Sequence, residues 1–158
     1  MREILFRGKQ EDNGEWVYGA YYHQTEFYGD DCDYHYIISS CDELEDNMMC
    51  FDGVIPETVG QYTGLADKNG KKIFEGDIVN AVIVRDLGGG TENRQETGII
   101  AYDKIGMIGL IEKYAGTIPV WSDFFQELTL SGCISDFWFE IIGNIHDNPE
   151  LIESEDNK

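Results

Sequence analysis

The chain has 158 residues, of which 42% are hydrophobic and 13% aromatic, a composition that excludes a disordered polymer and predicts one folded domain. Its net charge is −20, and the segment from Gln10 to Asp67 holds 14 Asp and Glu but no Lys or Arg. Such a surface repels phosphate backbones and anionic membranes, so direct nucleic-acid binding is disfavoured, whereas basic protein patches or cations are favoured partners. The alternative interpretation, which we favour, is that the acidic charge simply keeps the protein soluble.

We expect neither a signal peptide nor a membrane-spanning segment in this chain. The apolar run Ile4–Phe6 is too short for the hydrophobic part of a signal peptide. No apolar run approaches the ~20 residues that a spanning helix needs. We therefore expect a cytoplasmic protein whose four cysteines are reduced thiols.

The N-terminal third predicts a β-hairpin and a third strand. The apolar residues Ile4–Phe6 and the β-forming run Glu15–Tyr22 flank a turn at Asp12–Gly14. Another strand is expected at Tyr34–Ile38. The acidic run Asp42–Asp46 is typical of an exposed loop.

The central part, Val54 to Val84, has the clearest strand pattern. Short strands are expected at Val59–Tyr62, Ile73–Phe74 and Ile78–Val84, and glycine turns join them. This pattern favours a small closed or half-closed barrel of the SH3 type, since closure removes exposed sheet edges.

The C-terminal part predicts further strands and two short helices. After a Gly-rich tip at Gly88–Gly90, strands are expected at Gln95–Ala101, Met107–Lys113 and Phe137–Ile142. Asp123 and Gln126 suggest a capped helix running to Leu128. A second helix is expected at Asn148–Leu151, with the asparagine as its cap and Pro149 in its first turn, before a fraying tail.

We therefore expect a mainly β fold (β-rich α+β) with a small SH3-like barrel element, an N-terminal β extension and one or two short helices. Residues 1–158 are expected to form a single domain. Within it, residues 1–53 are an N-terminal β lobe, 54–147 the barrel-like core, and 148–158 the short helix and tail.

Cysteine and histidine side chains provide the candidates for a metal site. Cys32 and His35 stand three positions apart, with Cys41 and Cys50 downstream, and four such ligands can build a tetrahedral zinc site. Zinc knuckles usually supply their ligands in two tight pairs, however, and this spacing is loose. We favour unrelated thiols, and expect no cofactor and no bound metal.

Catalysis has no recognisable motif in this sequence. The three histidines, His23, His35 and His146, lie in no nucleophile elbow or zinc-protease pattern. We therefore expect no catalytic residues. Aromatic residues on strands could line a ligand surface, although most are expected to form the core. These are Trp16, Tyr18, Tyr21, Tyr22, Tyr62, Phe74, Trp121, Trp138 and Phe139.

Three segments resemble the YopX-like proteins of bacteriophages and prophages. The N-terminal one covers residues 2–9 and 14–19, the central one 54–65 and 67–79, and the C-terminal one 140–151. The resemblance implies a phage-encoded, mostly β protein in a bacterial host cytosol, without an assigned activity or catalytic residues to carry over. Residues 32–50 and 88–94 do not align with the family pattern.

Three hypotheses follow for the function. The first is a phage accessory protein that acts by binding another protein, or as a homo-oligomer. The second is an acidic mimic of DNA that blocks a host nucleic-acid-binding protein. The third is a metal-dependent enzyme of unknown substrate.

Overall fold

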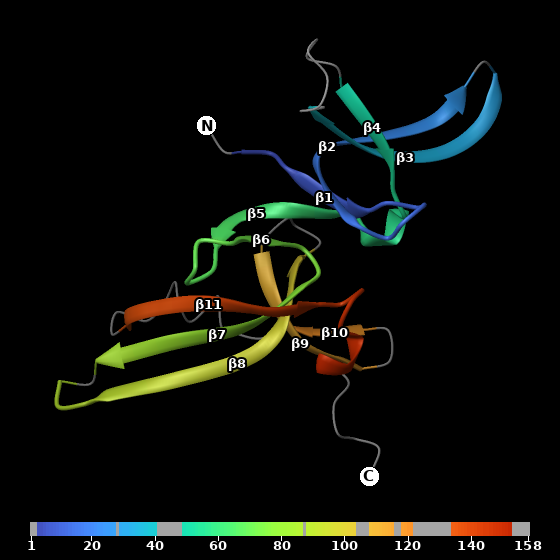
Figure 1. The fold of residues 1–158 in the computed structure, drawn as a ribbon. Helices are drawn as coiled ribbons and strands as arrows, with labels where there is room; N and C mark the ends of the chain where they lie inside the picture. The colour runs from blue at the N-terminus through green and yellow to red at the C-terminus, as the bar shows by residue number, and fades with distance from the viewer. Residues whose placement is uncertain are drawn as a thin grey trace. The chain divides into compact units, whose positions relative to one another are not determined.

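The computed structural model describes residues 3–27, 29–40, 49–86, 88–103, 108–115, 118–121 and 134–152 (Figure 1). Over these residues the chain is built from antiparallel strands with two short 3-10 helices, so the expected mainly β fold is confirmed. The chain divides into two compact units, Met1–Tyr62 and Thr63–Lys158. The boundary lies inside a strand, nine residues after the end of the lobe expected from sequence.

The first unit is a sheet of hairpins. Its strands pair in the order β4-β3-β2-β1-β5, and the 3-10 helix η1 precedes β5. The expected hairpin around Asp12–Gly14 is present, since β1 pairs antiparallel with β2 from Phe6↔Gly19 to Lys9↔Trp16. The elements are β1 (Phe6–Lys9), β2 (Trp16–Phe27), β3 (Asp30–Ser40), β4 (Met49–Gly53), η1 (Pro56–Thr58) and β5 (Gly60–Ala66).

Few of the described side chains of this unit are fully buried. Ile37 and Val54 are completely covered, and the rings of Phe6 and Tyr21 lie 5.6 Å apart. Strand β2 approaches β3 so closely at Gly19 that an added Cβ would lie 2.1 Å from the backbone oxygen of Ile38. Only glycine fits at this position.

The second unit contains a five-stranded antiparallel sheet in the order β10-β9-β8-β7-β11, and the short β6 pairs with β5. Strands β7 and β8 pair without a register shift from Ile78↔Ile99 to Asp86↔Thr91. The elements are β6 (Lys72–Phe74), β7 (Asp77–Asp86), β8 (Thr91–Tyr102), β9 (Ile108–Ala115), β10 (Ile118–Trp121), β11 (Ile134–Asn144) and η2 (Pro149–Leu151).

The core of the second unit follows from alternation along β7. Val79, Ala81 and Ile83 point to one face, where they pack in a buried cluster with four residues from other strands: Ile73, Ile100, Leu110 and Phe139. On the other face Ile78 packs with Ile99 and Ile111. A sheet covered by apolar clusters on both faces gains most of its stability from this burial.

The expected SH3-like barrel is not closed in the part of the chain that the structure describes. The second sheet ends at β10 on one side and at β11 on the other. Closure requires strands that bend at bulges or glycines. The long β7–β8 pairing instead has no register shift, and β11 lies along the other side of β7 (Figure 1).

The two expected short helices have different outcomes. The helix expected at Asp123–Leu128 lies outside the described residues. At the C-terminal end, η2 forms a single 3-10 turn with Pro149 in its first position. The Asn148 side chain does not cap this turn. Its oxygen instead accepts a long hydrogen bond of 3.4 Å from the Asn144 backbone N–H, which links the turn to the end of β11.

Candidate functional site

The sheet β2-β3-β4 places aromatic side chains on one face by strict alternation. Tyr22 of β2 lies opposite Tyr36 of β3, and Phe51 of β4 lies opposite Ile38, two residues along β3. Tyr34 and Met49 share this parity on β3 and β4. We call Tyr22, Tyr34, Tyr36, Met49 and Phe51 the aromatic face.

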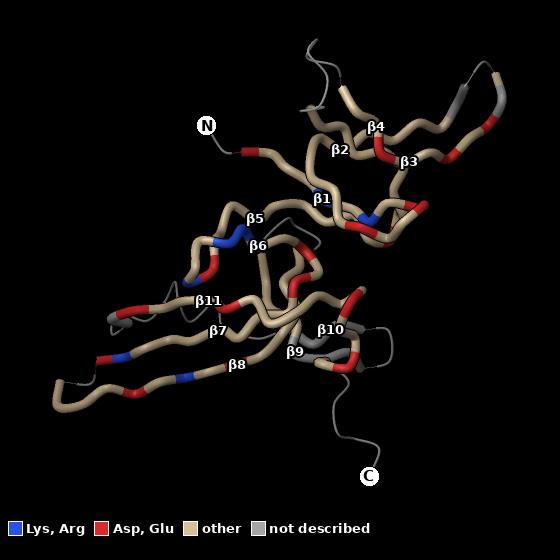
Figure 2. Tube along the Cα trace, in the orientation of Figure 1, with Lys and Arg blue, Asp and Glu red and all other residues tan. Residues whose placement is uncertain are grey.

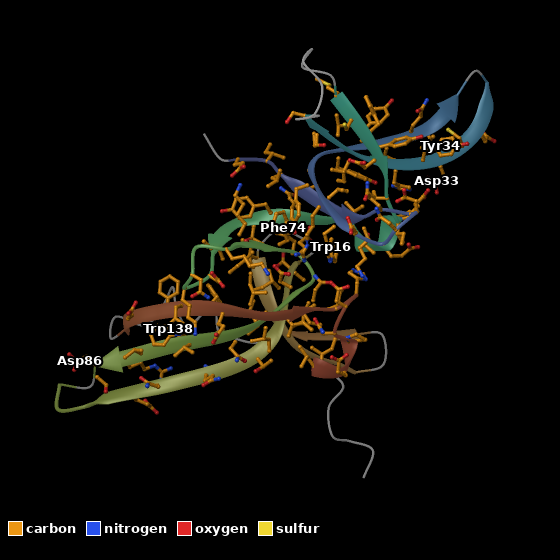
Figure 3. The ribbon with its side chains drawn as sticks, in the orientation of Figure 1. Trp16, Asp33, Tyr34, Phe74, Asp86 and Trp138 are labelled. Carbon is orange, nitrogen blue, oxygen red and sulfur yellow. The ribbon has the colours of Figure 1, made fainter. Side chains whose placement is uncertain are left out.

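The rings of the aromatic face form a connected series. Tyr36 lies in its middle, with ring centroids 6.5 Å from Tyr22, 6.2 Å from Tyr34 and 6.3 Å from Phe51. The outer members are open to solvent, because 52% of Tyr34 and 57% of Phe51 is exposed. These side chains therefore form a surface patch rather than a core (Figure 3 labels Tyr34).

A connected patch of aromatic side chains is unusual on a solvent-exposed sheet face that has no binding role. Scattered exposed apolar side chains are ordinary, whereas contiguous ones mark a binding surface. Tyr, Phe and Met are also residue types enriched at protein interfaces. The aromatic rings bury a large area with few rotatable bonds, and the flexible Met adapts to its partner. The arrangement can thus accept a partner's apolar or cationic side chains.

The first unit as a whole is strongly acidic. Residues 1–62 contain 14 Asp and Glu but only three Lys and Arg, namely Arg2, Arg7 and Lys9. The guanidinium of Arg7 and the ammonium of Lys9 both lie over the Trp16 ring, at 4.6 and 5.5 Å from its centroid. Figure 2 shows acidic but no basic positions along the described parts of β3 and β4. A basic partner is the one that this field attracts.

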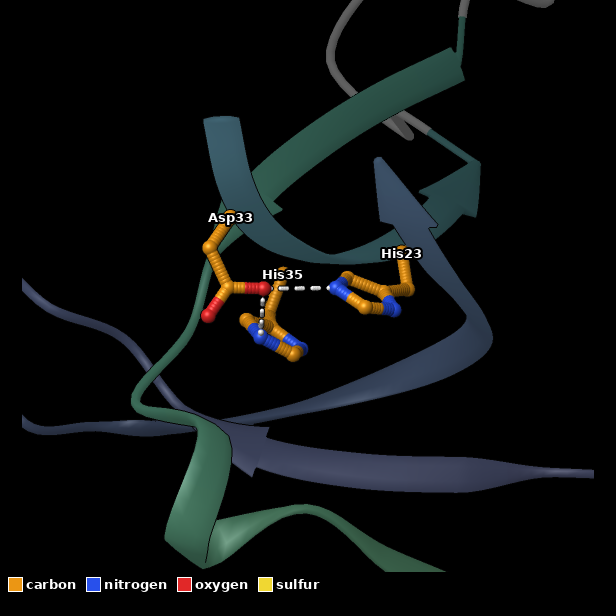
Figure 4. Close-up of side chains that lie close together, drawn as sticks. All are labelled: His23, Asp33 and His35. Atoms are coloured by element: carbon orange, nitrogen blue, oxygen red, sulfur yellow. Dashed lines mark hydrogen bonds and ion pairs between the residues drawn. The ribbon is translucent and has the colours of Figure 1, made fainter. Parts of the chain in front are cut away.

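The opposite face of the same hairpin holds a polar cluster. His23 and His35 lie directly across from each other on β2 and β3, and their rings stack with centroids 4.3 Å apart. Their Nε2 atoms lie 2.7 and 3.2 Å from the same carboxylate oxygen, Oδ1 of Asp33 (Figure 4). Behind His35, the Tyr21 hydroxyl is 2.5 Å from Nδ1. We call His23, Asp33 and His35 the His–Asp cluster.

Two pKa values are shifted at this cluster. The hydrogen bond from His23 is the main cause that lowers the pKa of Asp33, and the two imidazoles add to it. Burial is the main cause that raises the pKa of Tyr21, and the negative charge of Asp33 adds to it. Asp33 therefore remains an anion and Tyr21 a neutral phenol at neutral pH.

The four residues considered for metal binding from sequence do not come together among the described residues. Only His35 joins a cluster with metal-ligand chemistry, and its neighbours there are His23 and Asp33. The Cys32 thiol donates to the backbone oxygen of Gln24 at 3.3 Å. Cys50 is disulfide-bonded, which differs from the expectation of reduced thiols, and Cys41 lies outside the described residues.

The remaining histidine sits in a turn. The backbone N–H of His146 donates to the side-chain oxygen of Asn144 at 2.9 Å, and Asn144 O accepts from Asn148 N at 2.8 Å. This is an Asx-type turn at the end of β11. The hydrogen bond described for His146 uses its backbone N–H, and its imidazole is not among the atoms of the His–Asp cluster.

Sequence alone did not identify either surface of the β2–β3 hairpin. Of the aromatic residues considered, Phe74 and Phe139 are buried in the second unit, whereas Tyr22 joins the aromatic face. Phe51 was missed because no strand was expected at β4. Tyr34 and Tyr36 lie on a strand that was expected, but the strand pattern alone does not show which of its faces stays exposed. For the His–Asp cluster, the sequence shows only that Asp33 and His35 stand two residues apart on one strand and so share a face. The third member, His23, can be identified only from the register that places it opposite His35.

Comparison with known proteins gives a family but no activity. A family model described as "YopX protein" matches residues 5–153. No curated protein matches the chain. A solved structure titled "Crystal structure of protein EF1440 from Enterococcus faecalis" is 24% identical, covering 97% of this chain and 100% of that chain, with a TM-score of 0.41. Over the described residues, no helix is long and apolar enough to cross a bilayer. Because the matched residues extend through both units, the chain belongs to the YopX protein family.

Proposed function

We propose that this YopX family member acts by protein–protein binding, and that the aromatic face receives a basic segment of the partner. The observation that carries the proposal is the connected, solvent-exposed series of rings around Tyr36. The wider role that we propose is that of a phage or prophage accessory protein in the cytoplasm of a bacterial host.

Charge complementarity favours a basic partner over a second copy of this chain. Two copies would bring together two surfaces in which acidic residues far outnumber basic ones. A partner's Lys or Arg can instead stack its cationic head on a tyrosine ring and lay its methylene stem along the neighbouring rings. Such contacts are strongest where water is excluded, as at the centre of an interface.

The test compares variants in affinity capture from a bacterial host lysate at low salt. Tyr34→Ser combined with Phe51→Ser removes two outer rings of the aromatic face. Phe137→Ser is the matched control, since Phe137 is an exposed aromatic residue on a strand of the second unit. We expect the wild type and the control to recover the same basic protein. The double variant should recover at least about 10-fold less of it, as for the loss of an interface anchor.

Two outcomes would overturn this proposal. Equal recovery by the double variant and the control would place the contact elsewhere. Concentration-dependent dimerisation of the purified wild type that the double variant abolishes would make a second copy the occupant. Circular dichroism of both variants checks that the sheet is retained.

The DNA-mimic hypothesis has no specific observation in its favour. Such a mimic needs carboxylates arranged like phosphates along one face. Figure 2 shows the acidic positions of the described residues on strands and turns of both units. We therefore retain protein binding through the aromatic face as the proposed function.

A further inference from the structure

We propose that the His–Asp cluster binds a divalent first-row transition-metal ion, with Zn²⁺ as the ion to test. The site goes beyond the proposed function, because it uses the face of the β2–β3 hairpin opposite to the aromatic face. Its potential ligand atoms are one nitrogen from each of His23 and His35 and one oxygen of Asp33, all within 4.8 Å of one another.

The backbone brings the ligands together without help from a loop. Directly opposite positions in an antiparallel pair place their Cβ atoms about 4.5–5.5 Å apart, which sets the two imidazoles side by side with an interplanar angle of 10°. Asp33 precedes His35 by two residues on β3 and so has the same parity. Both Nε2 atoms already point at Oδ1 of Asp33. An ion with metal–ligand distances of about 2.0–2.2 Å would take a place between these three atoms, with Oδ1 moved away from the two nitrogens.

The donor set selects the class of ion. Imidazole nitrogens suit Zn²⁺, Cu²⁺, Ni²⁺ and Fe²⁺, whereas Ca²⁺ requires six to eight oxygen ligands and Mg²⁺ a near-octahedral oxygen shell. The cluster offers one carboxylate against two imidazoles. Calcium and magnesium are therefore poor occupants, even on a protein of this net charge.

Tyr21 provides the support that metal-bound histidines usually have. A ligating imidazole commonly donates its other N–H to an oxygen, which fixes the ring and its tautomer. The Tyr21 hydroxyl lies 2.5 Å from Nδ1 of His35 and can accept this hydrogen bond, leaving Nε2 for the ion. The packing of the Tyr21 ring against Phe6 ties this support to the unit's interior.

The exposure of the ligands gives the site an inner and an outer side. The His35 side chain is 12% exposed, whereas His23 is 38% and Asp33 77% exposed. Three protein ligands leave one tetrahedral position open, as in metal sites that exchange water or accept an outside ligand. The geometry points to an open position on the solvent side, where a water molecule or a partner's side chain can complete the shell.

The experiment is calorimetric titration of the full chain with Zn²⁺ in excess Mg²⁺, which saturates weak carboxylate sites. We expect one site whose affinity falls on the order of 100-fold or more in Asp33→Ala, His23→Ala and His35→Ala, since loss of a ligand exceeds the 10–100-fold cost of losing an outer partner. Tyr21→Phe should weaken binding about 10-fold. His146→Ala and Asp31→Asn are the matched controls and should bind as the wild type does.

Cobalt substitution separates this site from a thiolate site. Cys32→Ser should leave Zn²⁺ affinity unchanged, and the Co²⁺ complex of the wild type should lack the intense near-ultraviolet band of cobalt–thiolate bonds. That band, or loss of binding in Cys32→Ser, would assign the ion to cysteine ligands and overturn the proposal. Absence of Zn²⁺ binding at micromolar concentration, or equal binding by Asp33→Ala and Asp31→Asn, would do so as well. Because Asp33 is highly exposed, Asp33→Ala tests the ligand without removing a buried contact.

Discussion

In the hairpin β2–β3 of the first unit and the hairpin β7–β8 of the second, side chains alternate between the two faces of the sheet. The result differs, because the first hairpin exposes many of these side chains and the second buries many of them. Along β7, Val79, Ala81 and Ile83 are fully buried in an apolar cluster. Along β2 and β3, the residues of one parity, such as Tyr22 and Tyr34, are exposed aromatics, and those of the other parity include the two histidines. The comparison teaches that the second unit concentrates the packing that stabilises a sheet, whereas the first displays side chains suited to binding.

The largest expected effect is a core truncation in the second unit. Ile83→Ala removes a fully buried side chain from the β7 cluster and should lower the free energy of unfolding by about 2–5 kcal/mol. Urea denaturation followed by circular dichroism measures it. Tyr34→Ala on the aromatic face should change the same quantity by no more than about 0.5 kcal/mol. Similar losses for the two variants would contradict the contrast between the hairpins.

A second prediction concerns the close approach of strands in each unit. Gly19→Ala would place a Cβ 2.1 Å from the Ile38 backbone oxygen, and Gly98→Ala would place one 2.7 Å from the Ile111 backbone oxygen. Since neither neighbour is a flexible side-chain end, we expect losses of about 1–3 kcal/mol in the free energy of unfolding, larger for Gly19→Ala.

Gly89→Ala is the control for both variants, because nothing lies within 4 Å of its added Cβ. Thermal unfolding of the three variants gives the ranking. Equal stability of Gly19→Ala and Gly89→Ala would show that β2 and β3 can separate at this point without cost.

The smallest effect is a pH-dependent one at the Asp67 turn of the second unit. Burial raises the pKa of this carboxyl, but hydrogen bonds from the backbone N–H groups of Lys71 and Asn69, both 2.8 Å long, outweigh it and the pKa is lowered. A lowered pKa means that the fold favours the anion, so the stabilisation is present above the ordinary pKa and is lost as pH falls through the folded-state value.

Asp67→Ala should therefore lower the free energy of unfolding by about 1 kcal/mol at pH 7, and by progressively less below about pH 4. Asp67→Asn, whose amide oxygen can still accept hydrogen bonds, should cost less at pH 7. Urea denaturation at a series of pH values measures both variants. If the free energies of unfolding of Asp67→Ala and the wild type differed by the same amount at pH 7 and pH 3, the negative charge of Asp67 would not be the stabilising feature.

The sequence predicted the parts of the fold that depend on local pattern. Alternation of β-formers and glycine turns located β7, β8 and β11, because a buried strand flanked by turns is visible in a short window. It could not predict that the sheet is open over the described residues, since closure depends on strand bending and on which edges pair. Strand β4 was missed because Met49–Gly53 is short and begins next to an acidic run.

The candidate site was less predictable than the fold, for a physical reason. Tyr22 and Tyr36 lie 14 positions apart in sequence, as do Tyr21 and His35, and only the register of β2 on β3 decides which of them meet. A shift of one residue would move every one of these side chains to the other face. Sequence spacing therefore suggested Cys32 as a neighbour for His35, whereas the pairing selected His23.

Strand β5 has a consequence for how this chain is inherited. Its first residues, Gly60 and Gln61, pair with β1 in the first unit, and the strand then continues past Tyr62 to pair with β6 in the second. A genetic breakpoint at the boundary would cut a strand and leave unpaired backbone groups on both fragments. Recombination at this boundary therefore cannot exchange the two units as separate folded parts. The family match, which runs from residue 5 to residue 153, agrees with this.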